Sequence, residues 1–221
     1  MGYSIELKNI SIKDYKEVLR SQNLLPGRRI LQDNIDKNFE AICLYGIVNL
    51  DELYKSISKP QKLELIANKI GLSVNYLTIL KREIGSFIQK PILISDFPEI
   101  SSAVQVKLSE HSIKTSKDLY DLSQGFSDMR IVCENVGISE NDINELFSLC
   151  DLVRINGVGA VFARILYISG LRRAKDFVTA NADELLEKFL EVNKDNKYTK
   201  AKLGKRDMQF CIDFAKIMSR V

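Results

Sequence analysis

Apolar residues recur at intervals of three and four along most of this chain, which is the spacing that places side chains on one face of a helix. The first such stretch includes Ile12, Tyr15 and Leu19. Ser11 directly precedes this stretch and Asp14 lies three residues further on, a spacing that is typical of a capped helix start. Strand-like alternation of apolar and polar residues is scarce. The pattern therefore predicts an all-α fold.

Two stretches interrupt the helical pattern. The first, LLPGRR, ends the opening helix, and the second, QKPILISDFPEI, contains Pro91 and Pro98. Because proline cannot continue a helix, the second stretch is the best candidate for a joint. We predict an N-terminal helical unit of residues 1–92, and a second part of residues 93–221 that holds the remaining repeats and the C-terminal helix.

A shared spacing indicates an internal repeat. Three predicted helix ends are each followed by an apolar residue and, five residues later, by an acidic one; the helix ends and acids are Gly46 with Glu52, Ser112 with Asp118, and Gly170 with Asp176. Further helix ends at Gly71 and Gly137 lie 25 residues after Gly46 and Ser112, so both intervals between the two copies are 66 residues. Helix packing alone imposes no common period, so the spacing favours two copies of one helical unit and a third, shorter copy around Gly170.

Aligning the copies on these helix ends places three tripeptides at the same position of the repeat, which we call the slot. They are Asp33-Asn34-Ile35, Glu99-Ile100-Ser101 and Gly157-Val158-Gly159. Only the last copy has glycines in this slot, whereas the first two have an acidic residue there.

Composition argues against most kinds of chemistry. The four cysteines are scattered without a C-x-x-C pair, and His111 is the only histidine, so we expect no metal site and no Cys–His nucleophile. The paired acids Asp51-Glu52 and Asp183-Glu184 fall in predicted first turns, where they complement the helix dipole. KLGKRD lacks the spacing of a phosphate-binding loop. We therefore expect a protein that is not an enzyme, with no cofactor and no small-molecule substrate.

The sequence also bears on location. No apolar run reaches the length of a membrane span, and the first residues include acids and lack the apolar core of a secretory signal. Free, buried cysteines are typical of a reducing compartment. We therefore expect a cytoplasmic protein without a membrane partner.

The segment INGVGAVFARIL resembles the helix-hairpin-helix motif, in which an apolar residue and a G-x-G turn join two helices, with a small residue, here Ala163, shortly after the turn. Together with LLPGRRIL, YLTILKREI, SDFPEI and DMQFCIDFAK, it makes the chain from about Leu24 to Met218 similar to an uncharacterised bacterial family, domain of unknown function 4332. This resemblance implies an array of divergent helix-hairpin-helix-like units, in two or three internal copies. It implies no established activity.

In the nucleic-acid-binding members of the wider superfamily, the backbone N–H groups of the hairpin bind a phosphate oxygen. The resemblance thus makes the glycine turn a candidate contact, and basic residues before and after it would add to the attraction. The candidate residues are Gly157, Val158, Gly159, Arg154, Arg164, Arg172, Arg173, Lys175, Lys200 and Lys202. The charge distribution is compatible with this role at the two ends of the chain only: residues 1–90 carry 14 basic and 10 acidic side chains (+4), residues 91–150 carry 4 and 10 (−6), and residues 151–221 carry 14 and 9 (+5).

Two functions stay open. The first is sequence-independent binding of a DNA or RNA backbone through the Gly157–Gly159 turn. The second is protein–protein interaction or scaffolding without nucleic-acid binding, in which the turn only closes a helix pair. The wide apolar surface of DMQFCIDFAKIMSRV is expected to be buried, either within the chain or against a second copy.

Overall fold

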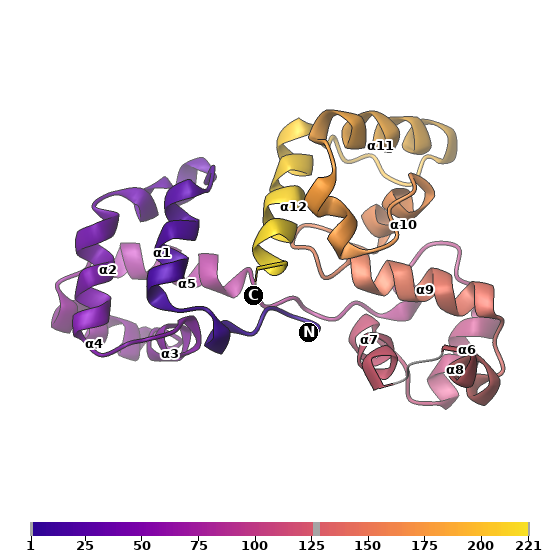
Figure 1. Ribbon diagram of the computed structural model, residues 1–221, viewed down its shortest axis with the longest axis horizontal. Coiled ribbons are helices and arrows are strands. Elements are labelled where there is room, and N and C mark those ends of the chain that lie inside the picture. Colours follow the sequence, from indigo (N-terminus) through magenta and orange to yellow (C-terminus); the bar gives the residue numbers. More distant parts are fainter. Residues whose placement is uncertain (1, 126–128, 221) are drawn as a thin grey trace. The chain divides into compact units, whose positions relative to one another are not determined.

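The computed structural model describes residues 2–125 and 129–220 and consists of helices joined by turns (Figure 1). In these ranges the only strand-like pairings are two isolated bridges, between Ser11 and Asn49 and between Leu93 and Thr115. The predicted all-α fold is confirmed. None of the described helices is both long enough and apolar enough to cross a membrane.

The chain divides into two compact units. The N-terminal unit is Ser4–Ile88. The C-terminal unit is Gln89–Arg220 together with the first residues of the chain, up to Tyr3. The sequence places the division at residues 92 and 93, a few residues further along, and gives no sign that Gly2 and Tyr3 belong with the second half of the chain.

The N-terminal unit contains five α-helices and two short 3-10 helices. In chain order they are η1 (Leu7–Asn9), α1 (Ile12–Ser21), η2 (Pro26–Gln32), α2 (Ile35–Leu44), α3 (Leu50–Ser56), α4 (Pro60–Ile70) and α5 (Val74–Gly85). The stretch that breaks the first helical pattern, around Pro26, forms η2. The core is centred on Tyr15, whose ring lies edge-on to Phe87 and tilted against Phe39.

The C-terminal unit contains the remaining helices. In chain order they are η3 (Ile94–Asp96), α6 (Ser102–Glu110), α7 (Ser116–Gly125), α8 (Met129–Val136), α9 (Glu140–Leu152), α10 (Ala160–Ile168), η4 (Ala174–Thr179), α11 (Ala182–Asn196) and α12 (Lys205–Met218). Helix α12, yellow in Figure 1, packs against η4 and α11. Its predicted burial is therefore achieved within the chain, except for Phe210, which is 36% exposed.

The predicted helix start at Ser11 is confirmed, and α5, α9 and α11 start with a similar side-chain cap. Ser11, Ser73 and Ser139 each accept a hydrogen bond from the backbone N–H three residues on, and Asn181 accepts from Asp183 and Glu184. Each bond satisfies a donor that the helix itself leaves without a partner.

The three acids that mark the predicted repeat make the same contact. Glu52 accepts a hydrogen bond from the N–H of Val48, Asp118 from that of Lys114, and Asp176 from that of Arg172, at 3.0, 3.1 and 2.9 Å. In each case the donor lies four residues before the acid, in the turn that leads into the next helix.

Left-handed backbone conformations follow nearly the same spacing. The three predicted helix ends Gly46, Ser112 and Gly170 all have positive φ. Positive φ also occurs twelve positions before Gly46, at Asn34, and thirteen positions before Ser112 and Gly170, at Glu99 and Gly157. All three of these residues belong to the tripeptides that the sequence aligns. The C-caps of α4 and α11, Gly71 and Lys197, are left-handed as well, as is Gly137 after α8.

Candidate nucleic-acid interface

The glycine turn lies between α9 and α10 and is anchored by buried side chains. The side chains of Ile155 and Val158 are buried, and the N–H of Val158 donates to the carbonyl of Ile155 at 3.0 Å. Val158 therefore packs the turn against the core and offers neither a free side chain nor a free amide to a ligand. Of the predicted tripeptide, only the two glycines remain as contact groups.

Gly157 is needed for the shape of the turn. Its φ of +91° is one that residues with a side chain rarely adopt, and an added Cβ would lie 3.5 Å from the ring of Phe210. The backbone at Gly157 is exposed and lies beside this half-exposed aromatic residue of α12.

Gly159 has a different environment. It is the N-cap of α10, with φ −91° and ψ 178°, and no atom lies within 4 Å of an added Cβ. The N-cap provides no side-chain hydrogen bond, and the first turn of α10 contains no acid. Among the described residues, the N–H groups of Gly157, Gly159 and Ala160 have no hydrogen-bond partner. The turn therefore presents unpaired donors at the positive end of a helix dipole.

Arg154, which the sequence places beside the turn as a phosphate contact, is instead buried, with 5% of its surface exposed. Its guanidinium pairs with Asp151 and donates to the carbonyls of Gly2 and Tyr3 at 3.1 and 3.0 Å. All of these partners belong to the C-terminal unit. The placement is a correction: the sequence shows that Arg154 lies three residues before Gly157, but not toward which side its side chain points.

Arg164 is likewise buried, with 3% of its surface exposed. It donates to the carbonyl of Pro98 and pairs with Glu145 at 2.8 Å, and Glu99 lies 3.7 Å away. The charge of Arg164 is thus compensated by two carboxylates, and it does not contribute to a basic rim around the turn.

The remaining predicted cations lie at the surface. Arg172 stacks on the ring of Tyr167 with its guanidinium carbon 4.0 Å from the ring centre, and Arg173 lies over Phe147 at the same distance. Lys175, Lys200 and Lys202 are exposed, and no partner is found for them among the described residues. Both arginines follow the C-terminal end of α10, whereas the glycine turn precedes its first residue.

The segment between α11 and α12, which contains Lys200 and Lys202, is held at one point. The hydroxyl of Tyr198 in this segment donates a 2.5 Å hydrogen bond to Glu99. Burial, followed by the hydrogen bond to this carboxylate, raises the pKa of Tyr198 to about 12.

The exposed aromatic residue beside the turn is Phe210, which belongs to the helix surface that the sequence predicts to be buried. Its neighbours one turn away on α12, Arg206 and Asp213, are charged, and this is the signal that could have identified it.

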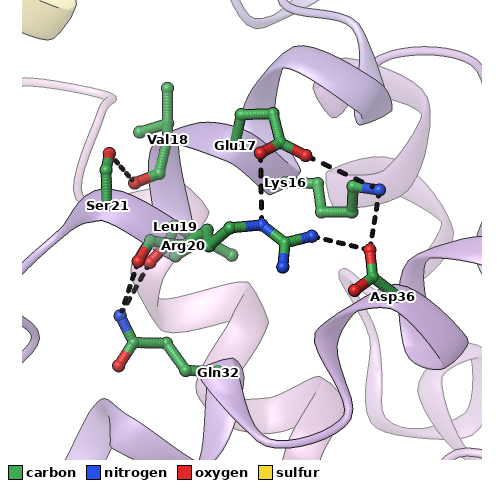
Figure 2. Close-up of polar contacts among 8 residues, drawn as sticks. All are labelled: Lys16, Glu17, Val18, Leu19, Arg20, Ser21, Gln32 and Asp36. Atoms are coloured by element: carbon green, nitrogen blue, oxygen red, sulfur yellow. Dashed lines mark hydrogen bonds and ion pairs between the residues drawn. The ribbon is translucent and has the colours of Figure 1, made fainter.

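The N-terminal unit carries a second polar cluster. Asp36 accepts hydrogen bonds from Arg20 at 2.6 Å and from Lys16 at 2.9 Å, and Glu17 contacts both cations, as Figure 2 shows. The hydrogen bonds from Arg20 and Lys16 lower the pKa of Asp36 to about 2. The cluster borders an open depression of about 560 Å³ that Phe39 and Cys43 also line. Two cations face two carboxylates here, so the cluster has no surplus charge with which to attract an anion.

In the described ranges, no group of three or more His, Cys, Asp or Glu side chains is arranged to hold a metal ion.

No curated protein and no solved structure matches the chain. A family match does exist: residues 98–217 match the family described as Domain of unknown function (DUF4332). The match covers more than half of the chain but omits the segment from Leu24 to Phe97 that the sequence resemblance includes. The chain belongs to the DUF4332 family.

Proposed function

We propose that this chain is a non-enzymatic protein of three helix-hairpin-helix-like units that binds a nucleic-acid backbone, independently of sequence, through the turn at Gly157–Gly159. The observation that carries the proposal is the uncapped start of α10, where Gly157 and Gly159 are exposed and Ala160 is half-buried. The amides of all three have no hydrogen-bond partner among the described residues. Unpaired N–H donors at a helix start form a favourable binding site for a phosphate oxygen.

The repeat is supported by contacts that core packing does not require. Each proposed unit has a left-handed residue before its first helix and another after it, and an acid that binds the N–H four residues earlier. The units differ in the slot that matters for binding. The first two place Asn34 and Glu99 at the left-handed position, whereas the third has Gly157. In the described structure Ser101 caps α6, and the first turn of α2 contains Asp36, whereas the start of α10 has neither a side-chain cap nor an acid.

The burial of Arg154 and Arg164 makes the proposed contact small. Lys175, Lys200 and Lys202 remain as exposed cations on the same unit, and each phosphate they neutralise adds about 0.9 to the slope of log affinity against log salt. We therefore expect weak binding that is visible at low salt and lost progressively as salt is added.

Gly159 offers a variant that separates binding from folding. Its N-cap backbone angles and the open space at its Cβ position allow Gly159→Asp to cap α10, which stabilises a helix by roughly a few tenths of a kcal/mol relative to glycine, while the carboxylate repels phosphate. Binding to a labelled generic duplex at about 50 mM salt should be lost in Gly159→Asp although the unfolding temperature rises. The matched control is Gly159→Ala, which adds a Cβ and leaves the amides free. Equal affinity of the wild type and Gly159→Asp, or no affinity of the wild type at this salt, would exclude the proposal.

Protein–protein interaction is the second candidate function, and one observation favours it. The turn after α2 exposes three apolar side chains within five residues: Leu44 (82% exposed), Tyr45 and Val48. Lys69 of α4 lies over the Tyr45 ring at 5.7 Å, and Leu65, one turn earlier on α4, is also exposed. Several apolar side chains together at a surface are typical of a protein contact.

This candidate makes a different prediction. Chemical cross-linking in cells should capture one defined partner with the wild type and lose it with Leu44→Ser plus Val48→Ser. Leu190→Ser, which changes an exposed leucine of the C-terminal unit, is the control and should keep the partner. If the same partner is captured by all three proteins, this surface is not the contact.

A further inference from the structure

A buried site in the C-terminal unit holds Gly2 and Tyr3, and the proposed function does not use it. Tyr3 is 3% exposed, although more than a hundred residues separate it from its partners in sequence. From Ser4 onward the chain belongs to the N-terminal unit, and it returns at Gln89. Two separate parts of the chain therefore belong to the C-terminal unit: the short segment Gly2–Tyr3 and the residues from Gln89 onward.

The main chain of the segment is recognised by Arg154. Its Nε donates to the carbonyl oxygen of Tyr3 at 3.0 Å and its Nη2 to that of Gly2 at 3.1 Å. The third nitrogen, Nη1, pairs with Asp151, whose other oxygen accepts from the N–H of Ala174 at 2.9 Å. One buried guanidinium thus binds two consecutive carbonyls, a contact that any residue type could make.

The side chain of Tyr3 is recognised separately. Its hydroxyl lies 2.6 Å from Oγ of Ser116, and its ring is edge-on to Tyr120 with 5.7 Å between the ring centres. Ser116 is fully buried and also accepts from the N–H of Ile92 at 2.9 Å. Because an unpaired buried hydroxyl is costly, this arrangement selects tyrosine over phenylalanine.

Every group that lines the site is held by a partner within the same unit. Asp151 orients Arg154, whose guanidinium carbon also lies 4.2 Å above the ring of Tyr120, and Ile92 orients Ser116. The site is therefore built largely without the segment that fills it, and such preorganisation lowers the cost of binding.

We propose that this is a peptide-binding site of the C-terminal unit, that its ligand is a non-helical peptide with two adjacent free carbonyls and a tyrosine, and that Gly2–Tyr3 occupies it in cis. Occupation satisfies the donors of a buried arginine that would otherwise lack acceptors. A tyrosine peptide supplied from outside the chain binds the same site once the segment is removed.

The test uses the whole chain with residues 1–3 replaced by a single Met before Ser4. Removing the segment should lower the midpoint of thermal unfolding, followed by circular dichroism, by several degrees. Adding the synthetic peptide Met-Gly-Tyr-Ser-Ile-Glu should restore part of that loss in a saturable way. The same peptide with Ala in place of Tyr should restore none, and the phenylalanine peptide should act only at higher concentration.

Two outcomes would overturn the proposal. An unchanged midpoint in the shortened chain would mean that the segment contributes nothing to the unit. A lowered midpoint, or loss of helix, that the tyrosine peptide does not reverse would mean that the contact only packs the chain and is not a ligand site. The alanine peptide, which keeps both carbonyls but lacks the tyrosine side chain, is the matched control.

Discussion

The side chain of Arg164 donates two hydrogen bonds to the carbonyl oxygen of Pro98, at 3.0 Å from Nε and 2.7 Å from Nη2. Pro98 directly precedes Glu99, the residue that holds the slot of Gly157 in the second proposed unit. An arginine one turn into α10 therefore fastens the turn of the preceding unit and does not face outward. Arg154 and Arg164, the two arginines nearest the glycine turn, are both buried and bind backbone carbonyls of the C-terminal unit, so neither faces solvent beside the turn.

Replacing Arg164 should destabilise the C-terminal unit strongly. Arg164→Met removes both hydrogen bonds to Pro98 and leaves Glu145 without its partner, and breaking a buried ion pair in this way costs about 3 kcal/mol. Urea unfolding followed by circular dichroism measures the loss. Arg172→Met, at an exposed position, is the control and should cost much less. Equal losses would show that the buried contacts of Arg164 do not stabilise the fold.

The acid of each proposed unit should matter individually. Asp176 accepts hydrogen bonds from the N–H groups of both Arg172 and Arg173, at 2.9 and 2.8 Å, so Asp176→Ala leaves two backbone donors without a partner. The cost should resemble that of a lost helix cap, about 1 kcal/mol. Asp118→Ala should behave alike, because Asp118 binds Lys114 and Thr115 in the same way. Asp195→Ala, an exposed acid with no such contact, provides the baseline in the same urea experiment.

Much of the fold could be predicted from the sequence because its signals are local. A serine such as Ser73 or Ser139 caps a helix through a residue three positions on, and Gly46 and Gly170 end helices through their own φ. The repeat spacing is similarly local, since Glu52 and its equivalents bind the N–H four residues earlier. None of these contacts depends on how distant helices pack.

The candidate site could be predicted only in part, because burial depends on partners far along the chain. Arg154 is adjacent to the turn in sequence, but its acceptors are the carbonyls of Gly2 and Tyr3. Arg164 is similarly directed by Pro98, and Phe210 reaches Gly157 only because α12 packs beside the turn. A single sequence carries no record of such long-range pairs, so the positive charge of a residue does not show whether it faces solvent.

Asp36 should remain ionised in strongly acidic solution. Hydrogen bonds from Arg20, and then from Lys16, lower its pKa to about 2 from 3.8 (Figure 2). A carboxyl whose pKa is lowered on folding contributes stability above its unfolded pKa and loses that contribution as the pH falls toward the folded pKa, here between about 4 and 2. The pKa of Asp36, followed by carboxyl-carbon NMR, should rise toward its ordinary value in Arg20→Gln. An unchanged pKa in that variant would show that Arg20 does not hold the charge.

The four cysteines should differ in reactivity. Cys150 and Cys211 are buried, and burial raises the pKa of both thiols, to about 12 for Cys211. Because the thiolate is the reactive form, both thiols should resist a thiol reagent at neutral pH until the chain unfolds. Cys43 is half-buried and lines the open depression beside α1, so it should react first. Mass spectrometry of peptides after brief labelling identifies the modified residue, with Cys43→Ser as the control. Rapid labelling of Cys211 in the folded protein would show that α12 opens from the glycine turn, since its Sγ lies next to Gly157.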